Sequence, residues 1–365
     1  MKISIGSKII DGPYGGGNEF LKNLTHYIEK KGHTVVNSLV DDDIDIILLT
    51  NPLFDSETST FNSADIEYYL TFINNNSLVF QRFNECDERK NTNHVNKKLI
   101  KSNRQVDLNI FVSDWLKHLF ENLGLNKEKN FSILGGPLGK KFNSTNKIYW
   151  TKNKSLKIVT HHWSSNLMKG FDIYSKLDSL VKNNNLDFKI EFTYIGNIPD
   201  NVNFENTSVV SSMSTEKISN ELKKHDIYIT GSINEPSGNH HIEAAQCGLP
   251  ILYRDSGGIP EYCDGFGVSF NDNFIEKLQE IIDDYSKYKN RIKKYPFSSK
   301  KMCDEFFDLF EKLLKSQKKI EINFFQIFIS KIYIYKNKVM LFLRKIFSFN
   351  IRFKIISMLK KVRNK

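Results

Sequence analysis

Two glutamates with seven residues between them are the strongest sign of chemistry in the sequence. Glu235 and Glu243 lie on either side of a turn that contains Gly238 and Asn239 and that follows a predicted strand at 226–230. The turn leads into a predicted helix, and free amides at a helix N-terminus can hold an anion such as a diphosphate. One carboxylate would then meet the sugar side of that diphosphate and the other the nucleoside side. A helix with an acidic first turn explains Glu243 but not the pair.

A glycine-rich run near the start of the chain is a second candidate. The letters GPYGGG occupy 12–17, directly after a predicted strand at 2–8 and before a predicted helix at 19–31. Glycines there allow close approach of the backbone to an anion at the helix N-terminus. The run is not G-x-G-x-x-G, and the acids at 41–43 precede the second predicted strand, so the dinucleotide signature is missing. Taken alone, a plain flexible turn is an equally good interpretation.

The third candidate is a lysine in the segment that follows the first strand of the second half. His161 ends that predicted strand, His162 follows it directly, and Lys169 and Gly170 come after. A lysine in this position is a point charge suited to phosphate, although surface lysines are common and one alone carries little weight. Successive strand residues point to opposite faces, so at most one of the two histidines faces a ligand.

The elements that must position these residues form two successive α/β units. Short apolar runs alternate with helical patterns, which predicts parallel sheets covered on both faces. Ligands are then expected at the carboxyl ends of strands, between the units. The predicted strands are 2–8, 44–50, 78–83, 108–113 and 131–134, then 156–161, 190–195, 208–211, 226–230, 250–253 and 267–270.

The domain prediction divides the chain into five parts. The first unit is a Rossmann-like domain at 1–142, joined by a polar linker at 143–154 to a second Rossmann-like domain at 155–299. A helix that reads as polar follows at 300–317, and a basic tail occupies 318–365. The linker is assigned from its polarity and its lack of a clear period.

Four segments, in this order, resemble the retaining family 4 glycosyltransferases of the GT-B fold. They read GPYGGGNEF at 12–20, FVSDWLKHLF at 111–120, LMKGFD at 167–172 and EPSGNHHIEAAQCGLPILYRDSGGIPEYC at 235–263. The last segment, with its E-x7-E spacing, is the specific one, and the resemblance covers about 1–316. It implies transfer of a hexose-like sugar from a nucleotide diphosphate sugar, with net retention and no obligatory metal or other cofactor. The resemblance also makes 1–142 the acceptor-side domain and 155–299 the nucleotide-sugar-binding domain.

The resemblance also implies roles for individual residues. Glu235 would lie by the donor sugar hydroxyls, Glu243 would bind the ribose, and Lys169 would contact the diphosphate. The family usually has an arginine about five residues before that lysine, where this chain has Ser164. Either His161 or His162 substitutes, or the phosphate is held less tightly. The complete set of expected donor-binding residues is Gly16, Gly17, His162, Lys169, Gly238, Asn239 and Glu243, with Glu235 and Lys169 as the catalytic pair.

A charged loop after the third predicted strand supplies the acceptor-side candidates. The segment QRFNECDERK at 81–90 looks like the R-x-N/D…R segment of a bacterial polysaccharide branch of that family. The resemblance makes Arg82, Asn84, Asp87 and Arg89 candidates for acceptor or donor-sugar contacts. A solvated charged loop is nearly as good an interpretation for Glu88 and Lys90 in the same segment.

Two acid-rich or histidine-rich patterns imitate metal sites. The acids at 41–43 and Asp45 resemble a D-x-D site, but they precede a predicted strand instead of following one. His240 and Glu243 have the spacing of zinc ligands on a helix, but a third ligand with suitable spacing is missing. The sequence therefore predicts no metal site.

The net charge is concentrated in the tail. The chain of 365 residues carries 52 Lys or Arg and 42 Asp or Glu, a formal charge of +10. Residues 318–365 contain thirteen basic residues and one acid, a balance of +12, so the other 317 residues hold 39 basic and 41 acidic ones, a balance of −2. Bulky apolar residues interleave with these charges, which favours an anionic membrane surface over nucleic acid. Packing of the tail on the body or on an oligomer partner is a third interpretation.

The cysteines and the apolar runs indicate where the protein acts in the cell, and several alternative functions stay open. Four scattered cysteines suit a reducing compartment, and no apolar run is long enough to span a membrane. We expect a cytoplasmic protein, peripheral on the inner face of the cell membrane, whose partners are a nucleotide sugar and a glycan or lipid-linked acceptor in surface polysaccharide synthesis. The rivals are a nucleotide-sugar epimerase of the same architecture, a dinucleotide-dependent oxidoreductase, and a non-catalytic membrane or nucleic-acid adaptor.

Overall fold

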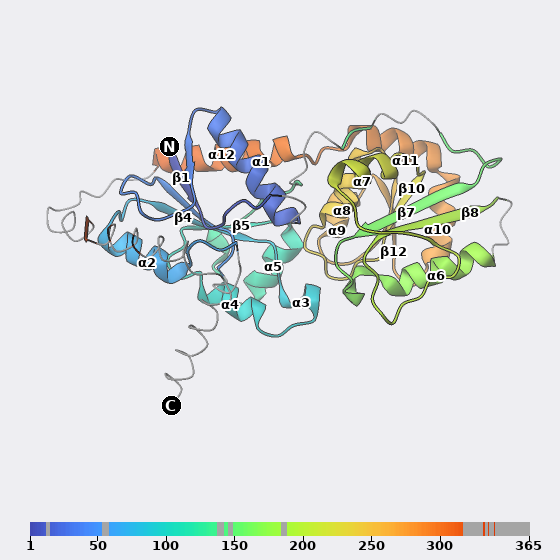
Figure 1. The fold of residues 1–365 in the computed structure, drawn as a ribbon, viewed down its shortest axis with the longest axis horizontal. Coiled ribbons are helices and arrows are strands. Elements are labelled where there is room, and N and C mark those ends of the chain that lie inside the picture. Colours follow the sequence, from blue (N-terminus) through green and yellow to red (C-terminus); the bar gives the residue numbers. More distant parts are fainter. Residues whose placement is uncertain are drawn as a thin grey trace.

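Two α/β domains, each built on a six-stranded parallel sheet, form the body of the protein (Figure 1). The computed structural model describes residues 1–11, 15–52, 58–136, 142–144, 149–183 and 188–316, with Lys331, Ile332, Tyr335 and Val339 in the tail. The predicted fold class, two Rossmann-like parallel-sheet domains, is confirmed. The basic tail at 318–365, apart from those four residues, lies outside the described part of the chain.

The first sheet has the order β2-β1-β3-β4-β5-β6. Its strands are nearly continuous apolar runs because helices cover both faces. In β3, for example, all four residues are buried. The strands are β1 (Lys2–Ile5), β2 (Thr34–Val36), β3 (Ile46–Leu49), β4 (Leu78–Phe83), β5 (Leu108–Phe111) and β6 (Asn130–Ser132), and the helices are α1 (Gly16–Lys30), α2 (Ser63–Phe72), α3 (Asp87–Lys90), α4 (Val95–Lys101), α5 (Asp114–Asn122) and the 3₁₀ turn η1 (Lys127–Lys129).

The second sheet has the order β12-β11-β10-β7-β8-β9. Its strands are β7 (Leu156–His162), β8 (Ile190–Gly196), β9 (Ser208–Val210), β10 (Ile227–Thr230), β11 (Ile251–Arg254) and β12 (Gly267–Phe270). Its helices are α6 (Phe171–Lys182), α7 (Thr215–Leu222), α8 (Asn239–Gln246), α9 (Ile259–Cys263), α10 (Phe274–Asp283), α11 (Tyr285–Arg291) and the 3₁₀ turns η2 (Leu167–Lys169) and η3 (Ile292–Lys294).

One strand was not predicted, and it corrects the interpretation of the nearby acids. β2 is a three-residue edge strand with no fully buried residue, so its hydrophobic signal is weak. Asp41 and Asp43 therefore follow the second strand, and the statement that they precede it is wrong. Both carboxylates pair with Lys2 Nζ, at 3.1 and 2.6 Å, and Lys2 begins β1. The acids thus lie at the amino end of the sheet, away from the edge where ligands are expected.

The last described helix returns to the first domain. α12 (Ser299–Ser316) lies beside α1 in Figure 1, and its apolar face joins the core formed by α1 and β1, β3 and β4. The helix was predicted at 300–317 as polar, which is wrong for this buried face. The residues that form it are Met302, Cys303, Phe306, Phe307 and Phe310.

Direct contacts join the two domains near the ends of their sheets. The Glu261 carboxylate of α9 accepts hydrogen bonds from the backbone amides of Asp114 and Trp115, each at 2.7 Å. These amides open α5, so a negative charge from the second domain lies at a helix N-terminus of the first. The adjacent Tyr262 hydroxyl donates to the Val112 carbonyl at 2.5 Å.

Further features bear on the other sequence expectations. Of the predicted linker, Trp150 is buried and packs edge-on against Phe188 and Tyr285 of the second domain. All four cysteines are free and buried. Among the helices of the described residues, none combines the length and apolar character needed to cross a membrane.

Candidate active site

The turn between the two glutamates is held in shape by a glycine. Gly238 precedes α8 with φ of 71°, and a Cβ at this position would lie within 3.0 Å of atoms of His240, His241 and Glu235. A side chain there would be strained by the positive φ and would crowd all three neighbours. The turn therefore places Glu235 just before the helix and Glu243 inside it, as the spacing predicts.

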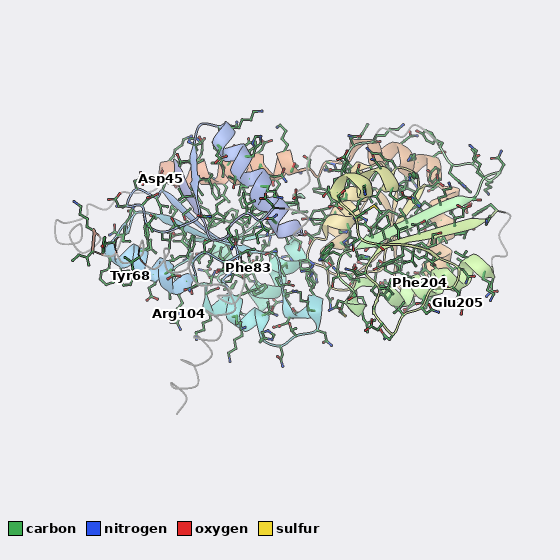
Figure 2. All side chains as sticks on the ribbon, viewed as in Figure 1. Asp45, Tyr68, Phe83, Arg104, Phe204 and Glu205 are labelled. Atoms are coloured by element: carbon green, nitrogen blue, oxygen red, sulfur yellow. The ribbon has the colours of Figure 1, made fainter. Side chains whose placement is uncertain are left out.

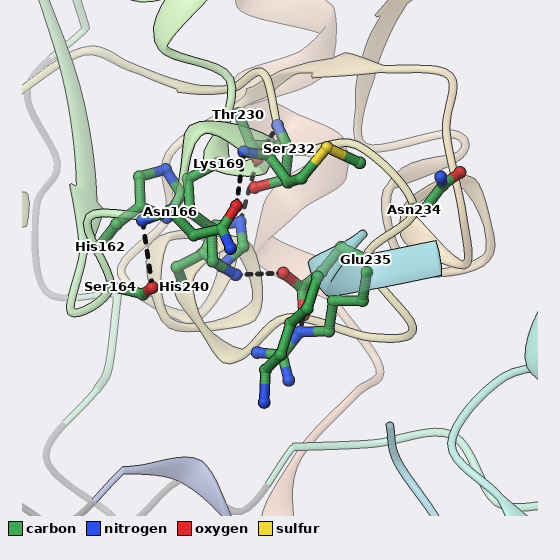
Figure 3. A network of polar contacts seen from close by, with 12 residues as sticks. His162, Ser164, Asn166, Lys169, Thr230, Ser232, Asn234, Glu235 and His240 are labelled. Carbon is green, nitrogen blue, oxygen red and sulfur yellow. Dashed lines mark hydrogen bonds and ion pairs between the residues drawn. The ribbon is translucent and has the colours of Figure 1, made fainter. Parts of the chain in front are cut away.

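Glu235 lies at the centre of a buried ionic cluster (Figure 3). The residue is 4% exposed, and its carboxylate contacts Lys169 Nζ through one oxygen and Arg89 Nε, at 3.0 Å, through the other. Burial acts to raise the pKa of Glu235, but the Arg89 and Lys169 charges outweigh it and lower that pKa to about 2. Glu235 is thus ionised at any physiological pH, and the three side chains together carry one net positive charge when Lys169 is protonated.

The lysine of this cluster comes from a turn that is docked on a neighbouring strand. Lys169 closes η2, and the next residue, Gly170, has φ of 95° and lies against the backbone of Gly231 so closely that a Cβ would collide with it. The Ile233 amide also donates to the Met168 carbonyl at 2.8 Å. This backbone contact brings Lys169 to the carboxyl end of β10, where Glu235 follows. Burial lowers the pKa of Lys169, and Glu235 opposes that effect.

The second glutamate has its own partner from β7. His161 Nε2 donates to Glu243 Oε2 at 2.7 Å, and the imidazole also lies edge-on to Tyr228. The other ring nitrogen, His161 Nδ1, is buried without a hydrogen-bond partner among the described residues. The Nε2–H group of His161 thus orients the Glu243 carboxylate through Oε2 and leaves Oε1 to accept a hydrogen bond from a hydroxyl.

The adjacent residue, His162, points to the opposite face of the sheet. His162 Nε2 is 2.6 Å from the Tyr174 hydroxyl of α6, so the two histidines face different layers as strand alternation predicts. Burial lowers the pKa of His162 well below its ordinary value. His162 is therefore a neutral side chain and does not replace the charge of the arginine whose place Ser164 takes, whereas the His161 ring pairs with Glu243. The guanidinium that reaches this region belongs to Arg89, in the first domain.

The glycine run approaches the same turn from the first domain. A Cβ on Gly16 would collide with the side-chain amide of Asn239, which opens α8, whereas a Cβ on Gly17 would meet no atom within 4 Å. The first turn of α1 thus faces the first turn of α8 across the boundary between the domains. The structure brings Gly16, Asn239 and Glu235 into one region, and Gly17 adjoins open space; residues 12–14 of the run lie outside the described part.

The charged loop after β4 divides into residues of different kinds. Asp87 accepts four hydrogen bonds, from the hydroxyl of Thr92 and the amides of His94, Val95 and Asn96. These bonds shape the entry to α4 and engage both oxygens of the Asp87 carboxylate in local structure. Asn84 is partly exposed directly after β4 and forms no side-chain hydrogen bond with the described residues.

Arg89 and Arg82 from the same segment differ in their partners. Arg89 pairs with Glu85 at 2.9 Å as well as with Glu235, and Glu235 is the main reason that the pKa of Arg89 is raised. Arg82 instead stacks on the ring of Phe20, with 4.0 Å between its Cζ atom and the ring centroid. Glu85 was not among the candidate residues, although it lies four residues before Arg89 and just ahead of α3, a spacing at which opposite charges can pair.

Metal ligands are not gathered in the described ranges. Those residues contain no group of three or more His, Cys, Asp or Glu side chains that could hold a metal ion. The two patterns considered in the sequence have other partners, since Asp41 and Asp43 pair with Lys2, and Glu243 pairs with His161.

Comparison with solved structures identifies the architecture. The structure of HepE from Anabaena in complex with UDP and glucose is similar with a TM-score of 0.62 and 14% identity, over 86% of this chain and all of that one. Sucrose-phosphate synthase from Thermosynechococcus elongatus gives 0.60 and 12%, over 87% of this chain and all of that one. The fold is GT-B. A glycosyltransferase from Rickettsia africae has the same GT-B fold, with a TM-score of 0.57, 16% identity and coverage of 87% and 99%.

Comparison of sequences shows that part of the second domain matches a known family and that shorter stretches of the chain match other proteins. Residues 197–296, which include both glutamates, match the family described as glycosyl transferases group 1. A phosphatidylinositol N-acetylglucosaminyltransferase subunit of Saccharomyces cerevisiae is 30% identical over 103 residues, 26% of this chain and 22% of that protein. Its Schizosaccharomyces pombe counterpart is 23% identical over 128 residues, 31% and 28%. The matched part spans about a quarter of the length of these relatives.

Proposed function

We propose that this protein is a retaining glycosyltransferase of family 4 that moves a hexose-like sugar from a nucleotide diphosphate sugar to a glycan or glycolipid hydroxyl. The observation that carries the proposal is the buried Glu235 carboxylate, held by Lys169 and Arg89 at the turn between the two glutamates. The glycosyl transferases group 1 match over 197–296 and the GT-B fold support the broader assignment to glycosyltransferases.

The nucleotide sugar would bind on the second domain. Glu243, oriented by His161, would accept hydrogen bonds from the ribose, and the amides at the start of α8 would face the diphosphate. Solved structures with the same fold contain UDP or UDP-glucose, among them HepE, which supports a nucleotide sugar as the donor. Gly16, on the opposite side of the boundary, would let the first domain approach the same phosphates.

Catalysis would consist of positioning and electrostatic stabilisation. As the bond between the sugar and the diphosphate breaks, negative charge grows on the leaving phosphate and positive charge on the anomeric carbon. Lys169 and the helix amides would stabilise the former, and Glu235 the latter. The leaving diphosphate would take the proton of the acceptor hydroxyl on the same face, so that retention requires no obligatory metal. Arg89 would supply the second cation that the sequence lacks at Ser164.

The acceptor would enter over the loop that follows β4, in surface polysaccharide synthesis at the inner face of the cell membrane. Arg82, near the end of β4, and Asn84, directly after it, have side-chain polar groups without a hydrogen-bond partner among the described residues. The yeast relatives are, by their names, N-acetylglucosaminyltransferases acting on phosphatidylinositol, which favours a lipid-linked acceptor.

A screen of nucleotide sugars tests the donor assignment. We expect one of UDP-glucose, UDP-N-acetylglucosamine, UDP-galactose or GDP-mannose to raise the unfolding temperature and to be hydrolysed slowly without an acceptor. A ligand at one hundred times its Kd stabilises the folded state by about 2.7 kcal/mol. Thermal denaturation and release of the nucleotide diphosphate are the measurements. Conversion of the nucleotide sugar to its epimer would instead identify an epimerase, and binding without turnover of any donor or acceptor would identify an adaptor.

The proposal includes membrane attachment through the tail. Each basic residue near an anionic leaflet contributes about 1 kcal/mol, and 318–365 holds thirteen of them. Deleting 318–365, which preserves α12, should release the protein from liposomes containing anionic lipid in a sedimentation assay. Transfer to a soluble acceptor should stay unchanged, because the site residues lie before 300. Undiminished binding of the truncated protein to those liposomes would show that the tail is not the membrane anchor.

A further inference from the structure

Arg82 is a buried cation without a counter-charge in the described structure. The residue is 8% exposed and lies in β4, one position before the end of the strand. Within residues 1–11, 15–52, 58–136, 142–144, 149–183 and 188–316 its guanidinium forms no hydrogen bond and no ion pair, and its one contact of a recognised kind is the ring of Phe20. Burial lowers the pKa of Arg82 to about 10, so the side chain keeps its charge at neutral pH.

This arrangement differs from that of the other arginine in the same segment. Arg89 is satisfied by two carboxylates, Glu85 and Glu235. An unpaired buried charge destabilises a protein, so a protein that keeps one in place commonly uses it for a ligand. Stacking on Phe20 occupies one face of the Arg82 guanidinium and leaves its in-plane N–H groups available. Five donors in a rigid plane match the oxygens of a phosphate or a carboxylate.

The position of Arg82 separates it from the groups proposed for the donor. Along β4, Arg82 shares a face with Phe80, the face covered by α1 and α12, and it lies near Tyr262 of the second domain. The guanidinium is thus at the carboxyl end of a central strand, beside the domain boundary. The groups proposed to bind the diphosphate, which are Lys169 and the amides at the start of α8, belong to the second domain. Arg82 belongs to the first domain.

We propose that Arg82 binds an oxyanion carried by the acceptor, a phosphate or carboxylate close to the hydroxyl that receives the sugar. The inference rests on the proposed function, because it assigns the acceptor side of that same site. Phe20 holds the guanidinium in place, and Arg82 then orients the acceptor through paired N–H bonds to the anion. A neutral glycan hydroxyl would leave the buried charge unmatched.

The experiment uses inorganic phosphate as the probe, with the donor side filled by saturating UDP or GDP. The full-length protein is titrated with phosphate at constant ionic strength, and the unfolding temperature is followed. We expect a saturable rise for the wild type and for Arg104→Met, which removes an exposed arginine of the same domain (Figure 2), and a loss of at least tenfold in apparent affinity for Arg82→Met. Without phosphate, Arg82→Met should unfold at or above the wild-type temperature, because it removes an uncompensated buried charge.

The outcomes separate this inference from the proposed function. If neither nucleotide stabilises the wild type but phosphate does so through Arg82, the donor assignment fails and the anion site stands. If phosphate has no saturable effect on the wild type, or acts equally on Arg82→Met, the inference is overturned. If Arg82→Met does not fold, Arg82→Lys takes its place, because it keeps the charge and loses the planar guanidinium. The same loss of at least tenfold in apparent phosphate affinity is expected for it, and an unchanged affinity overturns the inference.

Further ligands distinguish the source of the anion. Glycerol 3-phosphate represents a free phosphomonoester, soluble dihexanoyl phosphatidylglycerol represents a lipid phosphodiester, and glucuronate represents a sugar carboxylate. The ligand whose affinity depends most strongly on Arg82 identifies the acceptor class. Equal affinity of all three for Arg82→Met and wild type would again contradict the assignment.

Discussion

Replacing Glu235 with glutamine is expected to lower the rate of sugar transfer by a factor of about 10²–10³ while the protein stays folded. The amide keeps the shape of the carboxylate, but it removes the negative charge between Lys169 and Arg89. Two neighbouring cations then repel each other, and the charge that would steady the anomeric carbon is lost. The loss of one preorganised electrostatic group in an active site has an effect of this size. Initial rates with the donor found by screening, together with circular dichroism spectra, are the measurements.

A matched control for this variant is Glu276→Gln, which neutralises an exposed acid of the same domain. Its rate should equal that of the wild type. The stability of the Glu235 variant can fall, because the paired carboxylate has a pKa of about 2 in the folded protein and so contributes stability at every pH above its ordinary range of about 4. That contribution disappears as the pH falls toward 2. Transfer at the wild-type rate in a folded Glu235→Gln protein would remove Glu235 from the proposed mechanism.

Phe306→Ala is expected to be the most destabilising of the substitutions considered. Phe306 of α12 is 1% exposed, and its ring lies 5.3 Å from that of Phe20 and 5.9 Å from that of Phe310. Truncation to alanine would leave a cavity between α1 and α12, and such a change costs about 3–5 kcal/mol of the free energy of unfolding. Urea denaturation followed by tryptophan fluorescence and circular dichroism measures the loss, with separate midpoints expected if the two domains unfold independently.

The control for this prediction is Lys312→Ala, an exposed substitution on the same helix. It should change stability by less than about 0.5 kcal/mol. A loss below 1 kcal/mol in Phe306→Ala would mean that α12 is not part of the core of the first domain. Since Phe20 contacts both Phe306 and Arg82, the variant should also weaken the phosphate response of Arg82, which links the packing of α12 to the acceptor side.

Local patterns determined most of the secondary structure. Parallel strands read as short apolar runs, so eleven of the twelve strands within the described residues were predicted, and β4 and β12 have the predicted ends. The exception, β2, is a three-residue edge strand with no fully buried residue. The spacing of Glu235 and Glu243 around a glycine also fixed the turn before α8, because only a glycine fits its positive φ and its crowded surroundings.

Long-range contacts decided what sequence patterns could not. Arg89 and Glu235 are 146 residues apart, and no local rule pairs them. The same applies to Glu261, which reaches the amides at the start of α5. α12 read as polar because its charged face is visible in the sequence, whereas the surface that its phenylalanines fill exists only after the first domain has folded. The sequence alone therefore identifies the candidate residues. Whether a charge is paired, as in Arg89, or unpaired, as in Arg82, depends on which chain segments the tertiary structure brings beside it.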